Sequence, residues 1–553
     1  MPRGRWTIMR VVAGVVTSLI FTTALVFRIV GLEHLPGINA DEAYYGSVVM
    51  AFKAGENPEL TTVSGLPLNP FYSGLLYLIH SVVPTPSFWI LRMPALLSGL
   101  ALLALAHPLL AQVFDRTTAL RTTLLLACLP IAIAYSRFGW DQSQAPLASL
   151  LCLYFALKRQ LLGASVTFSF AMIVHPINVF LAPIVLGPMA AEWTAQRMAK
   201  SPAGAAGAST AIQDAEQVAR PATEEPGSPR HVLLVLIAAL AICALFFVWR
   251  LVPAKILQSW QANMLPGIGR RLVNPLDWGR YALLYSDFLT GTTIYRYVAG
   301  PVPEWSVGLQ RLAFVGILAI LLIRGLPRLV REHDLPALGL LAGLGISLAA
   351  CYLVIGPHAI GPGLERYAMW LVTPSCLALA LLLRATGDSV MATRLQLGLW
   401  IVCSLLLVGF QLHYFEPLLE TGGNAHRTFR TGPVEPKQAA FEAIEEVCQR
   451  QPATILAEDY WTFVPLYYLA RGRPELRVVQ CKEVKVEDES QRRFLVGFAG
   501  GPSEQWLATH APALRRQVII DYADRPVLYV WDLGTNSELL AGLKAAAATV
   551  PRN

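Results

Sequence analysis

Long apolar runs recur over the first 412 residues of the chain and are separated by short polar segments. A transmembrane helix needs about 20 consecutive apolar residues. Runs near that length cover residues 8–30, 88–113, 118–135, 143–158, 231–251, 307–324, 336–356, 366–384 and 394–412. The apolar stretch 163–191 is too long for one span and is interrupted by His175-Pro176, which predicts two short helices joined by a turn. The pattern predicts about eleven crossings.

Beyond about residue 413 the apolar runs become shorter and alternate with polar residues. The segment QAAFEAIEEVCQR (438–450) has the period of a helix. Five segments have the composition of short strands, namely ATILAED, LRVVQ, RRFLVGFAG, RQVIIDY and RPVLYVWDL. We therefore expect a mainly α-helical polytopic membrane domain over 1–412 and a soluble α/β domain over 413–553.

Composition agrees with a membrane protein. Hydrophobic residues make up 54% of the chain and charged residues 15%, whereas soluble domains carry about 25% charged residues. The net charge of +7 comes from short basic clusters between apolar runs, which is typical of cytoplasmic loops and disfavours nucleic acid as a partner. The first run follows Arg3, Arg5 and Arg10, exceeds a signal-peptide core and lacks an Ala-x-Ala site, so we expect a retained helix.

Basic residues alternate from loop to loop, and this alternation predicts sidedness. With the N-terminus in the cytoplasm, the inside loops contain Arg116, Arg121, Lys158, Arg159, Arg197, Lys200, Arg324, Arg328, Arg331, Arg384 and Arg394. The same count puts outside the segments 31–87, 136–142, 252–306, 357–365 and everything after about 413. The sequence thus predicts a multi-pass protein of the cytoplasmic (inner) membrane whose C-terminal domain is extracytoplasmic.

Two connecting segments have their own character. Residues 195–230 include a run rich in small residues and proline, which predicts a disordered cytoplasmic linker. The first outside loop, 31–87, contains apolar pieces such as FYSGLLYLIHSVV that are too short to cross, which favours helices along the membrane surface.

Six of the eight cysteines lie inside apolar runs, where cysteine behaves as a small hydrophobic residue. Cys448 and Cys481 instead lie together in the polar C-terminal region. If that region faces an oxidising compartment, the two could form a disulfide.

Charged and polar residues border apolar runs on the predicted outside face. They are Asp41, Glu42, Arg137, Asp141, His175, Glu365, Arg366 and Tyr367. An ionised group beside the bilayer is costly unless it is paired or functional. Any one of them is as well explained as an interface anchor. Their gathering on one side favours a common site.

This set of residue types suits group transfer from a phosphate-linked lipid. A carboxylate at the membrane surface can accept a proton from an acceptor hydroxyl or amine. An arginine fork can hold a phosphate whose negative charge grows as it leaves. Sugar is the usual group on such carriers.

Four segments carry a resemblance to a known superfamily. They are GLEHLPGINADEAYYGSVVMAFKAGENP, AYSRFGWDQSQAPLASLLCLYFALKR, HPINVFLAPIVL and ERYAMWLVTPSCLALALLL. Their order and topology over roughly 8–412 resemble the integral-membrane GT-C glycosyltransferases, and within them the protein O-mannosyltransferase and aminoarabinose transferase group, including glycosyltransferase family 39. The C-terminal domain resembles only the variable soluble domains of such enzymes.

The resemblance implies a GT-C fold and an inverting transferase that uses a polyprenyl-phosphate sugar as donor. It implies that Asp41 is the general base or orients the acceptor, with Glu42 as its neighbour, and that Asp141 matches a second acidic position. Donor-phosphate binding is implied for Arg366 and Tyr367. Arg137 and His175 are expected to assist.

Other functions remain open at this point. The chain has no Gly-Lys-Ser/Thr phosphate loop, no His-Glu-x-x-His pair and no Cys-x-x-Cys, so neither a metal site nor a cofactor beyond the lipid-linked sugar is indicated. The alternatives are a transporter or flippase of a lipid-linked sugar, which usually shows repeats and polar residues near mid-span, and a membrane-anchored scaffold. The sugar and the acceptor, whether protein, lipid or glycan, are left open.

Overall fold

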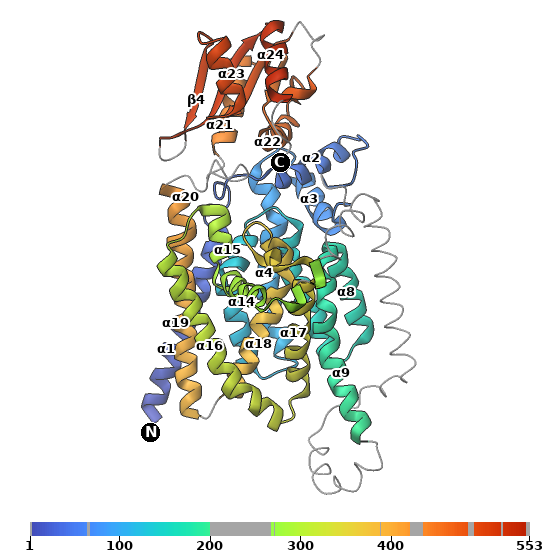
Figure 1. The fold of residues 1–553 in the computed structure, drawn as a ribbon, viewed down its shortest axis with the longest axis vertical. Coiled ribbons are helices and arrows are strands. Elements are labelled where there is room, and N and C mark those ends of the chain that lie inside the picture. The colour runs from blue at the N-terminus through green and yellow to red at the C-terminus, as the bar shows by residue number, and fades with distance from the viewer. Residues whose placement is uncertain are drawn as a thin grey trace.

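Long helices run side by side along the longest axis of the molecule, and a small sheet domain lies at one end of them (Figure 1). The computed structural model of the chain describes residues 3–62, 67–199, 267–269, 271–386, 389–420, 435–484, 491–520 and 524–548. The predicted span at 231–251 lies outside these residues.

The described part of the chain has seven helices that are long and apolar enough to cross a membrane. They are centred on α1 (Arg3–Ile29), α4 (Phe88–Leu110), α9 (Ala182–Ala199), α16 (Glu304–Arg331), α17 (Leu335–Ile355), α18 (Val372–Ala385) and α19 (Ser389–Phe410). The spans of α9 and α18 include the turn before each helix, and that of α19 continues to Glu420. All seven fall on predicted spans. The chain is a multi-pass membrane protein.

Other predicted spans form shorter helices that prolines interrupt. Residues 118–135 divide into α5 (Arg116–Cys128) and α6 (Pro130–Tyr135). The span at 143–158 is α7 (Ala145–Leu157), which follows the short 3₁₀ turn η1 (Asp141–Gln144). Proline ends each preceding segment because it has no N–H to donate and disfavours a helical residue before it.

The predicted break at His175-Pro176 is confirmed. Helix α8 (Leu161–Val174) ends there, His175 is extended, and the 3₁₀ turn η2 (Pro176–Leu181) leads into α9. His175 stabilises the new start, because its Nδ1 accepts a hydrogen bond from the N–H of Ile177 at 3.2 Å.

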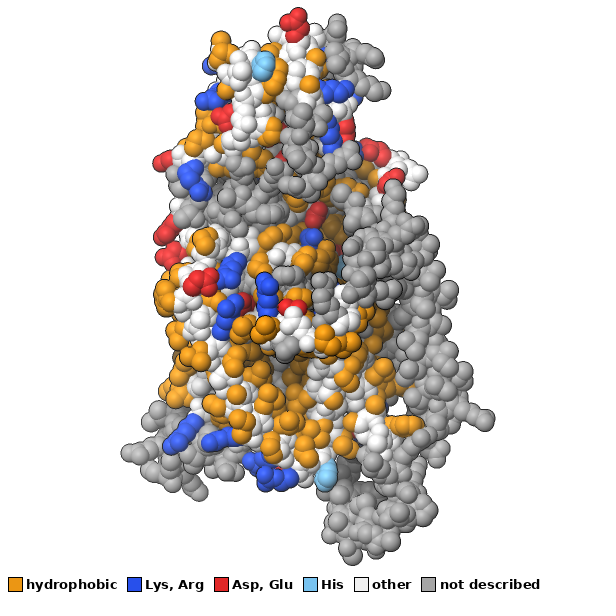
Figure 2. All heavy atoms as spheres, in the orientation of Figure 1, with side chains coloured by type: hydrophobic (Ala, Val, Ile, Leu, Met, Phe, Trp, Pro, Cys, Tyr) orange, Lys and Arg blue, Asp and Glu red, His pale blue; other side chains and the backbone are white. Residues whose placement is uncertain are grey.

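The outer helices expose apolar side chains that a soluble protein would bury. Leu312 and Ile323 of α16 and Leu405 of α19 are each more than half exposed. Figure 2 shows a broad hydrophobic surface on one face of the helical body. Such a continuous surface is suited to lipid. The packed interior lies around α5, α7 and α18, whose side chains are almost all buried.

Two short helices of the first loop lie between the helical body and the sheet domain (Figure 1). They are α2 (Ala40–Lys53) and α3 (Pro70–Val82), and neither is long enough to span. Asn39 caps α2 through a capping box with Glu42, and Asn69 caps α3, which has Pro70 in its first turn.

The C-terminal domain is a five-stranded mixed sheet with helices. In chain order its elements are α21 (Glu435–Cys448), β1 (Ala453–Ala457), α22 (Tyr460–Ala470), β2 (Leu476–Gln480), β3 (Arg492–Phe498), α23 (Pro502–His510), β4 (Arg516–Ile520), β5 (Pro526–Gly534) and α24 (Ser537–Ala548). The strand order is β2-β1-β3-β5-β4, with β1 parallel to β2 and β3, and β5 antiparallel to β3 and β4. All five strands lie within the segments predicted from sequence.

Cys448 and Cys481 are free thiols, so the disulfide considered from sequence is absent from the structure. The two residues pack into different cores. Cys448 lies in the core that contains Ile455, and Cys481 lies in the core that contains Leu456. Because successive residues of a strand point to opposite faces, the two thiols are on opposite sides of the sheet.

Candidate active site

Asp41 and Arg366 meet although 325 positions separate them. Asp41 lies in the first turn of α2, where its N–H donates to the Asn39 side chain at 2.7 Å. Arg366 lies in the 3₁₀ turn η5 (Glu365–Leu371) that precedes α18. Its Nη1 donates to Asp41 Oδ2 at 3.2 Å, and the two side chains are 34% and 22% exposed. Acid and base therefore form a pair that solvent and substrate can reach.

Aromatic rings surround the Arg366 guanidinium. Its Cζ lies 5.0 Å from the ring centroid of Trp140 and 5.0 Å from that of Tyr367. The His175 ring lies 5.2 Å from the Tyr367 ring. Nε of Arg366 has no hydrogen-bond partner among the described residues. The rings fix the plane of the guanidinium, and a planar cation held in this way suits an anion.

Figure 2 shows acidic and basic side chains together in a hollow between the sheet domain and the helical body.

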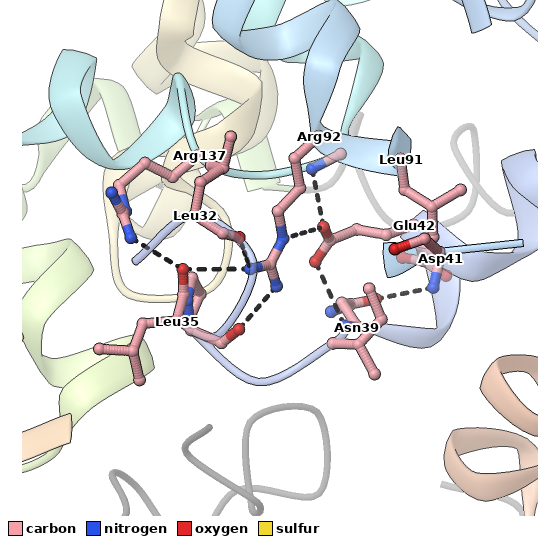
Figure 3. A network of polar contacts seen from close by, with 12 residues as sticks. Leu32, Leu35, Asn39, Asp41, Glu42, Leu91, Arg92 and Arg137 are labelled. Atoms are coloured by element: carbon pink, nitrogen blue, oxygen red, sulfur yellow. Dashed lines mark hydrogen bonds and ion pairs between the residues drawn. The ribbon is translucent and has the colours of Figure 1, made fainter. Parts of the chain in front are cut away.

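Glu42, the neighbour of Asp41, belongs to a buried network (Figure 3). Its side chain is fully buried, and Oε2 lies 3.2 Å from Nε of Arg92. Oε2 also accepts from the N–H of Gly139 at 2.8 Å, and Oε1 accepts from the N–H of Asn39 at 3.2 Å. A carboxylate with these partners holds the loop against α4 and is closed to an acceptor.

Arg92 ties the loop before α2 to α4. Besides Glu42, it donates to the carbonyls of Leu32 at 2.7 Å, Leu35 at 3.1 Å and Pro36 at 2.6 Å. It is fully buried. The sequence reasoning missed Arg92, although a charged residue inside the predicted span 88–113 was a signal that could have singled it out.

Arg137, like Arg92, is buried and donates to main-chain carbonyls of the segment before α2. Its Nη1 donates to the carbonyls of Phe27 and Val30, each at 2.7 Å, while Nη2 donates to that of Leu35 at 3.0 Å. Its donors are thus used on the backbone at the end of α1, and it lies with Arg92 around the same loop (Figure 3).

Asp141 is 5% exposed and is the first residue of η1, directly after Trp140. The structure places Asp41, Arg366, Tyr367 and His175 in one connected group. The contacts that join these four residues do not include Asp141. Within the ranges that the structure describes, no three His, Cys, Asp or Glu residues are grouped as metal ligands.

Tyr460 of the sheet domain also reaches Asp41. Its hydroxyl lies 3.4 Å from Asp41 Oδ1. Burial, and then the Asp41 carboxylate, raise the pKa of Tyr460, so that its hydroxyl remains a protonated donor. No feature of the sequence pointed to this residue, because 419 positions separate it from Asp41.

Helix α22 seats the sheet domain on the first loop. The Tyr468 hydroxyl accepts from the N–H of Ser87 and donates to its carbonyl, both at 3.1 Å, and lies 3.2 Å from Nε2 of His80. Gly46 of α2 permits this approach, because a Cβ there would lie 2.7 Å from the Tyr468 ring. Nearby, Lys437 Nζ donates to the carbonyl of Ile38 at 2.7 Å.

The His80 contact should make this seating sensitive to acid. Burial, and then the nearby Lys53, lower the pKa of His80 from 6.5 to about 4. The unfolded chain therefore takes up the proton first as pH falls, and folded-state stability should be lost between about pH 6.5 and pH 4, by up to roughly 3 kcal/mol. Thermal unfolding of the full chain across this range measures the loss, and His80→Gln should flatten the curve. An equal acid loss in wild type and His80→Gln would contradict this assignment.

Comparison with known proteins finds likeness in structure only. The sequence matches no protein-family model and no curated protein. The structure is similar to apo ArnT from Cupriavidus metallidurans, with a TM-score of 0.53, 14% identity, and coverage of 94% of this chain and 98% of ArnT.

Two further structures show weaker likeness. ArnT bound to undecaprenyl phosphate gives a TM-score of 0.49 at 14% identity, over 97% of this chain and 99% of ArnT. The apo oligosaccharyltransferase of Archaeoglobus fulgidus gives 0.45 at 12% identity, over 90% of this chain and 70% of the archaeal one. From its agreement with ArnT over nearly the whole length of both chains, this chain has the GT-C fold that ArnT has.

Proposed function

We propose that the chain is a glycosyltransferase that moves a sugar from a polyprenyl-phosphate donor to an extracytoplasmic acceptor. The observation that carries this proposal is the accessible Asp41–Arg366 pair, with a 3.2 Å contact, at the level where the helical body meets the sheet domain. The fold supports it, because ArnT shares the fold and has also been solved bound to undecaprenyl phosphate.

The two side chains divide the chemistry. Asp41 accepts the proton of the acceptor hydroxyl or amine as that atom bonds to the anomeric carbon of the sugar. The bond from the anomeric carbon to the phosphate oxygen breaks, and the electron pair leaves with the phosphate. Arg366 stabilises that growing charge when the phosphate engages its guanidinium. Attack opposite the departing phosphate inverts the anomeric carbon.

The remaining predicted residues take supporting roles in this proposal. Tyr367 and His175 form the wall beside the phosphate. Glu42 and Arg137, whose partners are buried main-chain and side-chain groups, hold the loop that presents Asp41. Asp141 directly follows Trp140, against which Arg366 stacks, and its role as a second acidic residue stays a prediction.

The charge distribution supports an orientation with the sheet domain outside the cytoplasmic membrane. Basic side chains gather at the end of the helical body opposite the sheet domain (Figure 2). At that end Arg384 lies between Asp115 and Asp334, and Arg328 pairs with Glu332. Basic residues favour the cytoplasmic side.

Donor and acceptor can be identified together by mass spectrometry of envelope glycans, lipids and proteins from cells with and without the gene. A glycan that disappears with the gene names the acceptor, and accumulation of its lipid-linked precursor names the donor. The purified protein should then transfer that sugar. If instead it moves the intact lipid-linked sugar across vesicles without chemical change, the transferase proposal is wrong and the flippase alternative gains support.

Arg366→Gln is expected to reduce kcat/KM for the donor by roughly 10- to 100-fold, because a charge-assisted contact to phosphate is lost. Arg366→Lys should recover part of the loss, since the charge returns without the fork geometry. Steady-state kinetics with varied donor measures both. Arg159→Gln is the control, because Arg159 is exposed and pairs with Glu192 away from the hollow. Equal kinetics for wild type and Arg366→Gln would remove Arg366 from donor binding.

A further inference from the structure

The two oxygens of the Asp41 carboxylate have partners from different parts of the chain. Oδ2 accepts from Arg366 at the start of the α18 segment, at 3.2 Å. Oδ1 lies 3.4 Å from the Tyr460 hydroxyl, which belongs to the C-terminal domain. Together the two partners restrict rotation of the carboxylate about its last bond.

Several contacts fix the position of Tyr460 beside Asp41. It is the first residue of α22, whose start is fixed by Asp459 through a capping box in which Asp459 Oδ1 accepts from the N–H of Thr462 at 3.0 Å. The Tyr460 ring packs edge-on against Trp461, with 5.4 Å between ring centroids. Further along the same helix, Tyr468 binds Ser87 in the membrane domain. The position of the Tyr460 hydroxyl therefore depends on how the C-terminal domain packs against the first loop.

We propose that Tyr460 is a positioning residue for Asp41, so that the C-terminal domain is an integral part of the active site. This inference rests on the proposed transferase function. When a donor phosphate engages Arg366, the contact from Arg366 to Asp41 weakens, and the Tyr460 hydroxyl is the donor that remains on the carboxylate. It keeps the second oxygen turned toward the acceptor while the proton moves.

The kinetic test is Tyr460→Phe, which keeps the ring and its packing but removes the hydroxyl. We expect kcat to fall roughly fivefold to tenfold with KM for the donor unchanged, because positioning of the base affects the chemical step. Tyr467→Phe is the matched control: it lies on the same helix and loses a hydroxyl that accepts from Arg471. A kcat for Tyr460→Phe equal to that of wild type, or an equal loss in Tyr467→Phe, would overturn the inference.

A second test needs no substrate. The melting temperatures of wild type, Asp41→Ala, Tyr460→Phe and the double variant form a cycle, and we expect the two effects to be non-additive because the side chains touch. Alanine is used at position 41 because an asparagine oxygen would still accept from the hydroxyl. Additive effects would overturn the contact. If wild type transfers no sugar from any lipid-linked donor while the cycle is non-additive, the proposed function fails and the contact stands.

Discussion

Asp41→Asn is expected to lower kcat by about 10²- to 10⁴-fold, because the amide cannot accept the proton of the acceptor. The substitution is nearly isosteric at a side chain that is 34% exposed, and the Asn39 cap that starts α2 does not depend on the carboxylate. The fold should therefore survive. Arg366 loses its ionic partner but keeps its stacking on Trp140 and Tyr367.

Transfer by the purified variant, at saturating donor and acceptor, measures this effect. Glu33→Gln is a suitable control because it removes one exposed negative charge from the same loop. Sugar transfer by a folded Asp41→Asn protein at the wild-type rate would exclude Asp41 as the base. A loss of similar size in Glu33→Gln would mean that the reaction depends on the net charge of the loop and does not depend on the Asp41 carboxylate in particular.

Arg92→Met is expected to cost about 3–5 kcal/mol of stability, the usual result of breaking a buried ion pair from one side. Glu42 would be left as a buried carboxylate without its cation. The carbonyls of Leu32 and Pro36 would lose the Arg92 donor as well, whereas that of Leu35 would keep Arg137. Because this loop carries Asp41, activity should fall together with the melting temperature.

Thermal unfolding in detergent measures the loss, and Arg159→Met provides the comparison, since an exposed pair contributes at most about 1 kcal/mol. Combining Arg92→Met with Glu42→Leu should recover part of the stability, because no uncompensated charge then remains buried. Wild-type stability of Arg92→Met alone would show that the network does not hold the loop.

Local patterns made much of the fold predictable. The apolar runs, the break at His175-Pro176 and the five strands depend on periodicity and on proline, which act over a few residues. The division of 118–135 into α5 and α6 was missed, although Pro130 lies within that run. The pairing of Cys448 and Cys481 stayed open at the level of sequence, because the sequence does not say which face of a sheet a residue outside the strands will join.

The candidate site was predictable only in outline. The predicted side of the membrane put Asp41 and Arg366 in one candidate site. It could not predict that Asp41 is partly exposed while its neighbour Glu42 is buried. Adjacent residues of a helix point about 100° apart, and their fates depend on Arg92, which lies 50 positions further on. Tyr460 depends on docking between two domains, for which a single sequence contains no local pattern.

The contact of α22 with α2 joins segments that are synthesised at very different times. The ribosome makes the loop with Asp41 early, whereas Tyr460 is added 419 residues later. Domains form in the order of their synthesis, so the nascent chain inserts most of its helices while its carboxylate still lacks one neighbour. A polypeptide that stops before α22 would therefore lack the Tyr460 contact to Asp41.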